Sequence, residues 1–168
     1  MSKEYAQQYE LNDFNKLTAF NKKLKINNLK QTDVGHYCDA TGEYNNRQIN
    51  IELKSRNQNL IINNNKLQIK GVEKDYVDNT LFIESHKIAD MLVDFIVNKS
   101  VPLYVNFLNN CTIVFNLSKL THKPIKKHIR AFSKLKDSFE IQDRLALYLY
   151  DAYIYDNNNK LIYKPTNE

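Results

Sequence analysis

The chain has 168 residues, of which 42% are hydrophobic and 11% aromatic. This composition supports one domain with a genuine core and argues against a disordered chain. The formal net charge of +5 favours an anionic partner, most commonly nucleic acid, although a solvated basic surface explains the charge equally well. The presence of only three glycines excludes the Gly-rich loops of most nucleotide-cofactor enzymes and the nucleophile elbow of α/β hydrolases.

Nothing in the sequence predicts export or insertion into a membrane. The N-terminal segment MSKEYAQQYE is polar and lacks the apolar stretch of a secretory signal. No run of about eighteen apolar residues occurs, so no membrane-spanning helix is expected. The two cysteines, Cys38 and Cys111, lack the spacing of a metal knuckle or a redox pair. We therefore expect a cytoplasmic protein with reduced thiols and no membrane contact.

The first predicted element is a helix over residues 3–24, where apolar side chains recur at helical spacing and no proline interrupts them. Residues 27–32 are expected to form a polar connection. Two short strands follow within residues 36–56, and the asparagines at residues 44–47 suit a tight turn between them. The next predicted helix is capped by Ser85 and runs for about three turns.

The second half of the chain is predicted to contain more strands and a basic helix. Residues 103–107 and 111–117 are expected to pair as strands, the second of them rich in buried β-branched side chains. A basic amphipathic helix is predicted to begin at Pro124, and a last hairpin turns at residues 157–159. Neither a repeat nor a linker is visible. The sequence therefore indicates one domain over residues 1–168, with a core at 3–120 and a basic helix and hairpin at 121–165.

Chemistry is suggested by residues 36–56 alone. Asp39 lies in the first predicted strand of this stretch, and Glu52 and Lys54 lie in the second. Because strand side chains alternate between faces, Glu52 and Lys54 point the same way and Leu53 points the other way. Two carboxylates and a lysine on one face could hold a hard cation and activate water against a phosphodiester. An ordinary surface strand, with Glu52 and Lys54 in cross-strand pairs, explains the same pattern.

The spacing of these residues resembles the PD-(D/E)XK nuclease superfamily. Glu52-Leu53-Lys54 is the single E-x-K of the sequence, and Asp39 precedes it at hairpin distance. The order helix, hairpin, helix, strand pair over residues 3–120 is similar as well. The resemblance implies an α/β restriction-endonuclease-like core, in which a central mixed β-sheet is flanked by helices. Cys38 stands where the family signature has proline.

The resemblance also implies the roles of the site residues. In this family the Asp and the Glu bind a divalent metal, and the Lys positions or activates the attacking water; Asp39, Glu52 and Lys54 take these roles by position. Mg²⁺ (or Mn²⁺) takes oxygen ligands and keeps several waters. The backbone carbonyl of Leu53 is a further ligand of this kind, and Glu10 is the candidate for the acidic ligand that an N-terminal helix often adds.

The implied activity is that of a Mg-dependent deoxyribonuclease that hydrolyses phosphodiester bonds of DNA, with an endonuclease favoured over an exonuclease. A homodimer is compatible with the resemblance, since small members often pair to cut both strands. Cationic side chains could contact DNA phosphates without sequence preference. The expected nucleic-acid-binding residues are Arg56, Lys123, Lys126, Lys127 and Arg130. Two alternatives stay open: a catalytically degenerate nucleic-acid-binding module of the same fold, and a protein–protein interaction domain.

Overall fold

The computed structural model describes residues 3–33, 35–64, 66–71, 77–133 and 138–165. It is an α/β fold around a seven-stranded sheet with the strand order β1-β2-β3-β8-β9-β12-β13. The strands of this sheet are β1 (Asn27–Gln31), β2 (Ala40–Tyr44), β3 (Arg47–Ser55), β8 (Val101–Phe107), β9 (Cys111–Asn116), β12 (Ala152–Asp156) and β13 (Leu161–Tyr163). The sheet is mixed, because β3 and β8 are parallel whereas every other neighbouring pair is antiparallel.

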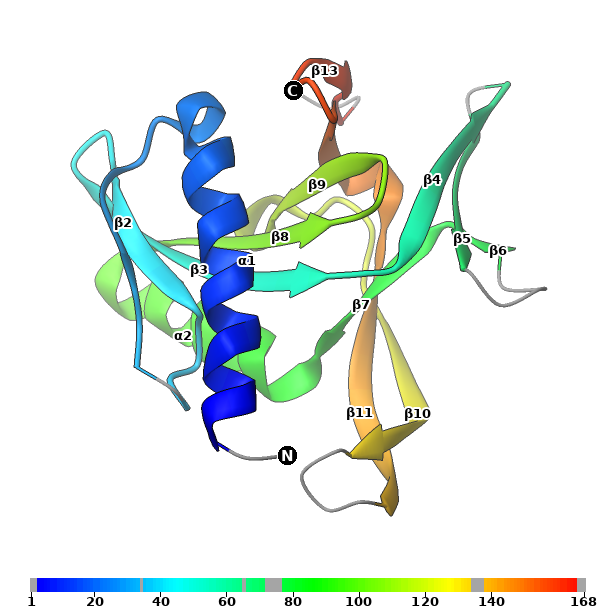
Figure 1. Ribbon diagram of the computed structural model, residues 1–168, viewed down its shortest axis with the longest axis horizontal. Coiled ribbons are helices and arrows are strands. Elements are labelled where there is room, and N and C mark those ends of the chain that lie inside the picture. Colours follow the sequence, from blue (N-terminus) through cyan, green and yellow to red (C-terminus); the bar gives the residue numbers. More distant parts are fainter. Residues whose placement is uncertain (1–2, 34, 65, 72–76, 134–137, 166–168) are drawn as a thin grey trace.

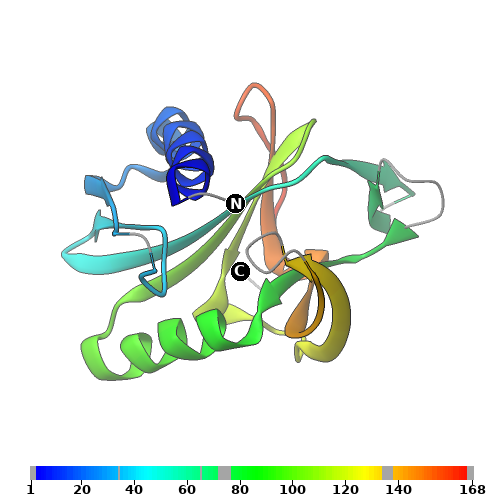
Figure 2. The ribbon, with the colours of Figure 1, turned by 60° about the horizontal axis from the view of Figure 1, so that its bottom comes forward.

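Two helices cover opposite faces of this sheet, α1 (Lys3–Leu24) on one side and α2 (Ser85–Asn98) on the other (Figure 2). Alternation along the strands explains the two layers, because β3 and β8 present apolar side chains to both faces. Leu17 and Phe20 of α1 pack in one buried cluster with Ile51 of β3. On the other face, α2 contributes to a second cluster that contains Tyr104 of β8 and Phe115 of β9.

Two small sheets extend from one side of the molecule, away from β1 and β2 (Figure 1). One consists of β4 (Gln58–Asn63), β5 (Lys66–Gly71) and β6 (Val77–Asp78); the other has the order β10-β11-β7, with β10 (Ile125–Ser133), β11 (Ser138–Tyr148) and β7 (Thr80–Glu84). Two short 3₁₀ turns link the large sheet to the β10-β11-β7 sheet: η1 (Leu117–Lys119) lies between β9 and β10, and η2 (Leu149–Asp151) lies between β11 and β12. Among the described residues, no helix is both long and apolar enough to cross a membrane.

Several elements lie where the sequence predicts them. The first helix has the predicted bounds, and the turn between β2 and β3 is formed by Asn45 and Asn46, both at positive φ. Asparagine tolerates this left-handed conformation, and two such residues form the tight turn that suits the twist of a hairpin. The predicted N-cap is one residue off, because Glu84 occupies the cap position and Ser85 is the first helical residue.

Two predicted elements have the wrong secondary structure. Residues 27–31, expected as a polar connection, form edge strand β1, which pairs with β2. The basic helix expected after Pro124 is strand β10, paired with β11 over its whole length. Ile125 and Ile129 are four residues apart, a spacing that places them on one face of a helix and also on one face of a strand. The pairing with β11 decides between the two, and the basic side chains are consequently divided between two faces.

Candidate active site

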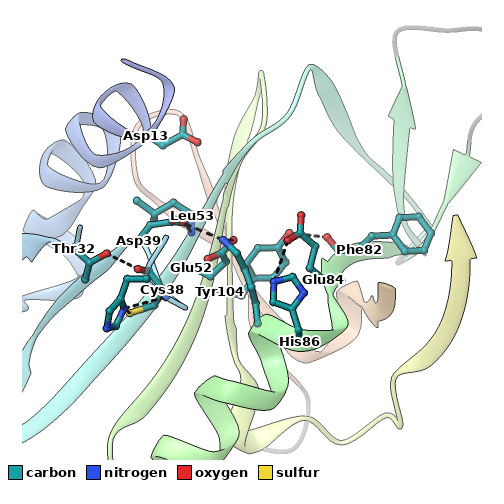
Figure 3. Close-up of polar contacts among 12 residues, drawn as sticks. Asp13, Thr32, Cys38, Asp39, Glu52, Leu53, Phe82, Glu84, His86 and Tyr104 are labelled. Atoms are coloured by element: carbon teal, nitrogen blue, oxygen red, sulfur yellow. Dashed lines mark hydrogen bonds and ion pairs between the residues drawn. The ribbon is translucent and has the colours of Figure 1, made fainter. Parts of the chain in front are cut away.

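Asp39 lies one residue before β2 rather than inside the strand, and it is fixed there by β3. Its backbone N–H donates to the carbonyl of Ile51 at 2.8 Å. Its side-chain Oδ2 accepts from the N–H of Leu53 at 2.7 Å, so the carboxylate continues the strand ladder beyond the end of β2 (Figure 3). Since the N–H and C=O of a strand residue point to the same side, the Leu53 carbonyl points toward the same edge as the Asp39 carboxylate.

Glu52 is the second carboxylate of the site, and it is buried, with 5% of its surface exposed. Its Oε1 accepts from the Nζ of Lys87 at 2.6 Å, and the same ammonium lies 3.8 Å from Oδ1 of Asp39. The hairpin and the first turn of α2 therefore bring Asp39, Glu52 and Lys87 together. The sequence analysis missed Lys87, although it precedes the buried Met91 by four residues and so lies on the inward face of α2.

The electrostatics of this cluster are unusual for a structural ion pair. Burial, and after it the charge of Asp39, raises the pKa of Glu52 to about 8. Burial alone would lower the pKa of Lys87, but the neighbouring Glu52 and Asp39 outweigh it and raise that pKa. The second carboxylate oxygen of Glu52, Oε2, is buried and accepts no hydrogen bond within the described parts of the chain. An unsatisfied buried carboxylate oxygen is costly, and it is a ready ligand for a hard cation.

Glu10 of α1 is close enough to Asp39 and Lys87 for their charges to shift its pKa, but no contact places it in the cluster. Burial raises the pKa of this half-buried carboxyl, and the charge of Asp39 raises it further, against a smaller opposite effect of Lys87. The helix on one face of the sheet and the helix on the other therefore both contribute charged groups that interact with Asp39. No group of three or more His, Cys, Asp or Glu side chains in the described parts of the chain is arranged to hold a metal ion.

The oxygen atoms of this cluster suit Mg²⁺, which needs few protein ligands, better than a structural metal ion that is coordinated by protein side chains alone. Mg²⁺ commonly takes one or two protein carboxylates and completes its shell with water and substrate phosphates. Asp39, Glu52 and the Leu53 carbonyl offer such a set of oxygen ligands, and no described residue donates a hydrogen bond to Glu52 Oε2. A structural zinc ion would need four protein ligands.

Lys54 follows Glu52 by two residues on the same side of β3, but it does not join the buried cluster. Its side chain is exposed, and it lines a small hollow together with Glu52, Glu84 and Arg144. Within the described residues, Lys54 forms neither an ion pair nor a hydrogen bond. Its ammonium is therefore free to contact a bound anion at the mouth of the site.

The remaining predicted contacts have different surroundings. Arg56 turns inward, donating to the Asn106 side chain at 2.8 Å, to the Tyr104 hydroxyl at 2.7 Å and to the Phe82 carbonyl. These bonds join β3, β8 and β7, so its guanidinium supports the fold around the site. Of the basic residues expected on a helix, Lys123 precedes β10, Lys126 and Lys127 lie on β10 with exposed side chains, and the Arg130 side chain lies outside the described part of the structure.

Comparisons with protein-family models, with curated proteins and with solved structures found no match for this chain. Its function has to be inferred from the site, because a fold class alone does not determine an activity.

Proposed function

We propose that the chain is a metal-dependent nuclease that hydrolyses phosphodiester bonds of DNA on a restriction-endonuclease-like core. The observation that carries this proposal is the meeting of Asp39 and Glu52 near one end of β3, where Glu52 Oε2 is buried and accepts no hydrogen bond from a described residue. Buried carboxylates with strongly perturbed pKa values are typical of functional sites. The chain passes from α1 through β1 and the β2–β3 hairpin to α2, with strands β4 to β7 inserted before α2. This order and the parallel pairing of β3 with β8 are compatible with such a core.

Each side chain has a role that follows from its position. Asp39, Glu52 and the Leu53 carbonyl would hold Mg²⁺ or Mn²⁺, which would supply Lewis acidity toward water and phosphate. Lys54, exposed beside Glu52, can donate to a phosphate oxygen or orient the attacking water. Lys87 holds the two carboxylates together and adds positive charge close to the reacting phosphate. Removing a single electrostatic contribution of this kind costs about a hundred- to a thousandfold in rate.

A second candidate function is favoured by the position of Lys87. Its ammonium, 2.6 Å from Glu52, already compensates the carboxylates without a metal, and the described residues offer no third side-chain ligand. In a catalytically degenerate module, this lysine would stand permanently in the place of the cation. Such a protein would bind nucleic acid in a salt-dependent manner, indifferent to divalent metal, and would leave it intact.

Incubation of the full chain with supercoiled plasmid and with single-stranded DNA, in Mg²⁺ or Mn²⁺ and in chelator, distinguishes the two functions. The nuclease is expected to nick or linearise the plasmid only with metal, and an attack on a closed circle identifies an endonuclease. Asp39→Asn and Glu52→Gln should each lower the rate by about a hundredfold or more. Glu43→Gln, an exposed carboxylate of β2, is the matched control and should cleave like wild type. Cleavage that survives Glu52→Gln unchanged, or no cleavage at all, would reject the nuclease.

A further inference from the structure

The hairpin formed by β10 and β11 carries two cationic faces, which differ in their neighbours. Side chains that are paired directly across an antiparallel ladder lie on the same face. Lys127 pairs with Arg144, and Arg144 pairs in turn with Glu84 of β7. Lys126 belongs to the opposite face, as does His128, which pairs with Asp143. Adjacent lysines of β10 are therefore presented to opposite sides of the hairpin.

The face that carries Lys126 is neutralised within the hairpin. Lys126 Nζ lies 2.9 Å from one Asp143 oxygen, and His128 Nδ1 lies 2.6 Å from the other. The hydrogen bond from Lys126, and to a smaller extent the one from His128, lowers the pKa of Asp143 below its ordinary value. A phosphate approaching this face meets a carboxylate between the two basic side chains.

The face that carries Lys127 leads to the candidate active site. Arg144 lines the same small hollow as Glu52, Lys54 and Glu84, so it belongs to the mouth of the site. It donates twice to the Gln142 side chain, at 2.5 and 3.2 Å, and its contact with Glu84 is long, at 3.9 Å. Lys127, one strand further out, is exposed and forms no ion pair with any described residue.

We propose that Lys127 and Arg144 form a backbone-binding track that leads the phosphates of a nucleic-acid strand from the hairpin to Lys54 and Glu52. The track rests on the proposed function for its ligand, and it assigns binding to one face of the hairpin only. Lys126 and His128 stay outside it, although Lys126 neighbours Lys127 in the sequence. Contacts of this kind are made to phosphates and not to bases, so the track should accept any sequence.

The two adjacent lysines provide a matched test. Binding of a labelled DNA duplex to the full chain is followed by fluorescence anisotropy over a salt series, in chelator so that nothing is cleaved. Wild type should show a log–log salt slope that Lys127→Ala reduces by about one, with weaker binding at every salt concentration. Arg144→Gln should reduce it similarly, whereas Lys126→Ala should leave the slope unchanged. Thermal unfolding of each variant separates a lost contact from a lost fold.

Equal slopes for Lys126→Ala and Lys127→Ala, or no binding by wild type, would overturn the track. The measurement is independent of the cleavage assay. If the chain binds DNA through Lys127 but does not cleave it, the backbone-binding track is supported and the nuclease activity is rejected. If cleavage depends on Glu52 but Lys127→Ala leaves the salt slope unchanged, the nuclease activity is supported and the track is rejected.

Discussion

The fold buries the carboxylate of Glu52, and burial of an ionised group lowers the stability of the folded protein. With 5% of its surface exposed and one oxygen without a hydrogen bond, it is more easily protonated than an exposed glutamate. Burial, followed by the charge of Asp39, raises its pKa from 4.5 to about 8. A residue selected for stability alone would be apolar at this position in β3, and the cost of burying Glu52 therefore supports the proposed role of this side chain in binding or catalysis.

This cost predicts a pH-dependent stabilisation by Glu52→Gln. Because the pKa in the folded state is raised, the folded protein keeps a proton that the unfolded chain releases between pH 4.5 and about 8. The free energy of unfolding of wild type therefore falls as the pH rises through that window, by at most about 1.4 kcal/mol per pH unit. Glutamine imitates the protonated side chain and escapes the loss.

Urea unfolding across this pH range checks the prediction without any added metal. Glu52→Gln and wild type should be equally stable at the acidic end, and the variant should become progressively more stable toward the alkaline end. Glu43→Gln, which changes an exposed side chain, controls for the loss of one negative charge. A variant that is less stable than wild type at all pH values would mean that the Lys87 ion pair outweighs the burial of Glu52.

Elements could be predicted from the sequence where the spacing of their apolar residues fits either a helix or a strand, but not both. The helix over residues 3–24 and the asparagine turn of the β2–β3 hairpin follow from local patterns, and so does the proximity of Asp39 to β3. Strand β10 was mistaken for a helix because Ile125 and Ile129 satisfy both periods, and only the distant β11 decides between them. Lys87 is separated from Glu52 by more than thirty residues, so no local pattern connects them.

Close packing of β1 on β2 makes Gly42 sensitive to a single methyl group. A Cβ at Gly42 would lie 2.3 Å from Cγ2 of Ile26 and 3.0 Å from the carbonyl oxygen of Asn27. Ile26 is buried and its Cγ2 lies at the β-branch, so it cannot avoid the methyl group by a rotation of its outer side chain. Ile26 and the backbone of Asn27, the first residue of edge strand β1, must therefore move together. Gly42→Ala should therefore cost about 1–3 kcal/mol of unfolding free energy.

Differential scanning calorimetry checks this cost as a loss of about 2–4 °C in Tm for each kcal/mol. The neighbouring Glu43→Ala is the control, because an exposed side chain of the same strand should change stability by less than about 0.5 kcal/mol. A Gly42→Ala protein as stable as wild type would indicate that β1 adjusts freely on the sheet.

At the scale of the whole molecule, the site lies where three elements are tied to one another. Asp13 of α1 accepts from the Ser55 hydroxyl at 2.5 Å and from its N–H at 3.1 Å, which fixes the helix to the end of β3. On the other face, the fully buried Asn50 of β3 donates to Asp94 of α2 at 2.5 Å. The groups around Glu52 are therefore held by the global fold and not by one flexible loop.

Because the site is held by the global fold, binding of a cation should raise the free energy of unfolding of the whole protein. A ligand that binds only the folded state adds RT ln(1 + [L]/Kd) to the free energy of unfolding, about 1.4 kcal/mol at ten times Kd. For a chain of this size, Mn²⁺ should then raise Tm by about 3–5 °C. The rise should disappear in Asp39→Asn and in Glu52→Gln, while KCl of equal ionic strength should not produce it. A rise of equal size in wild type and both variants would place the cation elsewhere. No rise at all would leave Lys87 as the permanent counter-charge of the two carboxylates and favour the metal-independent binding module.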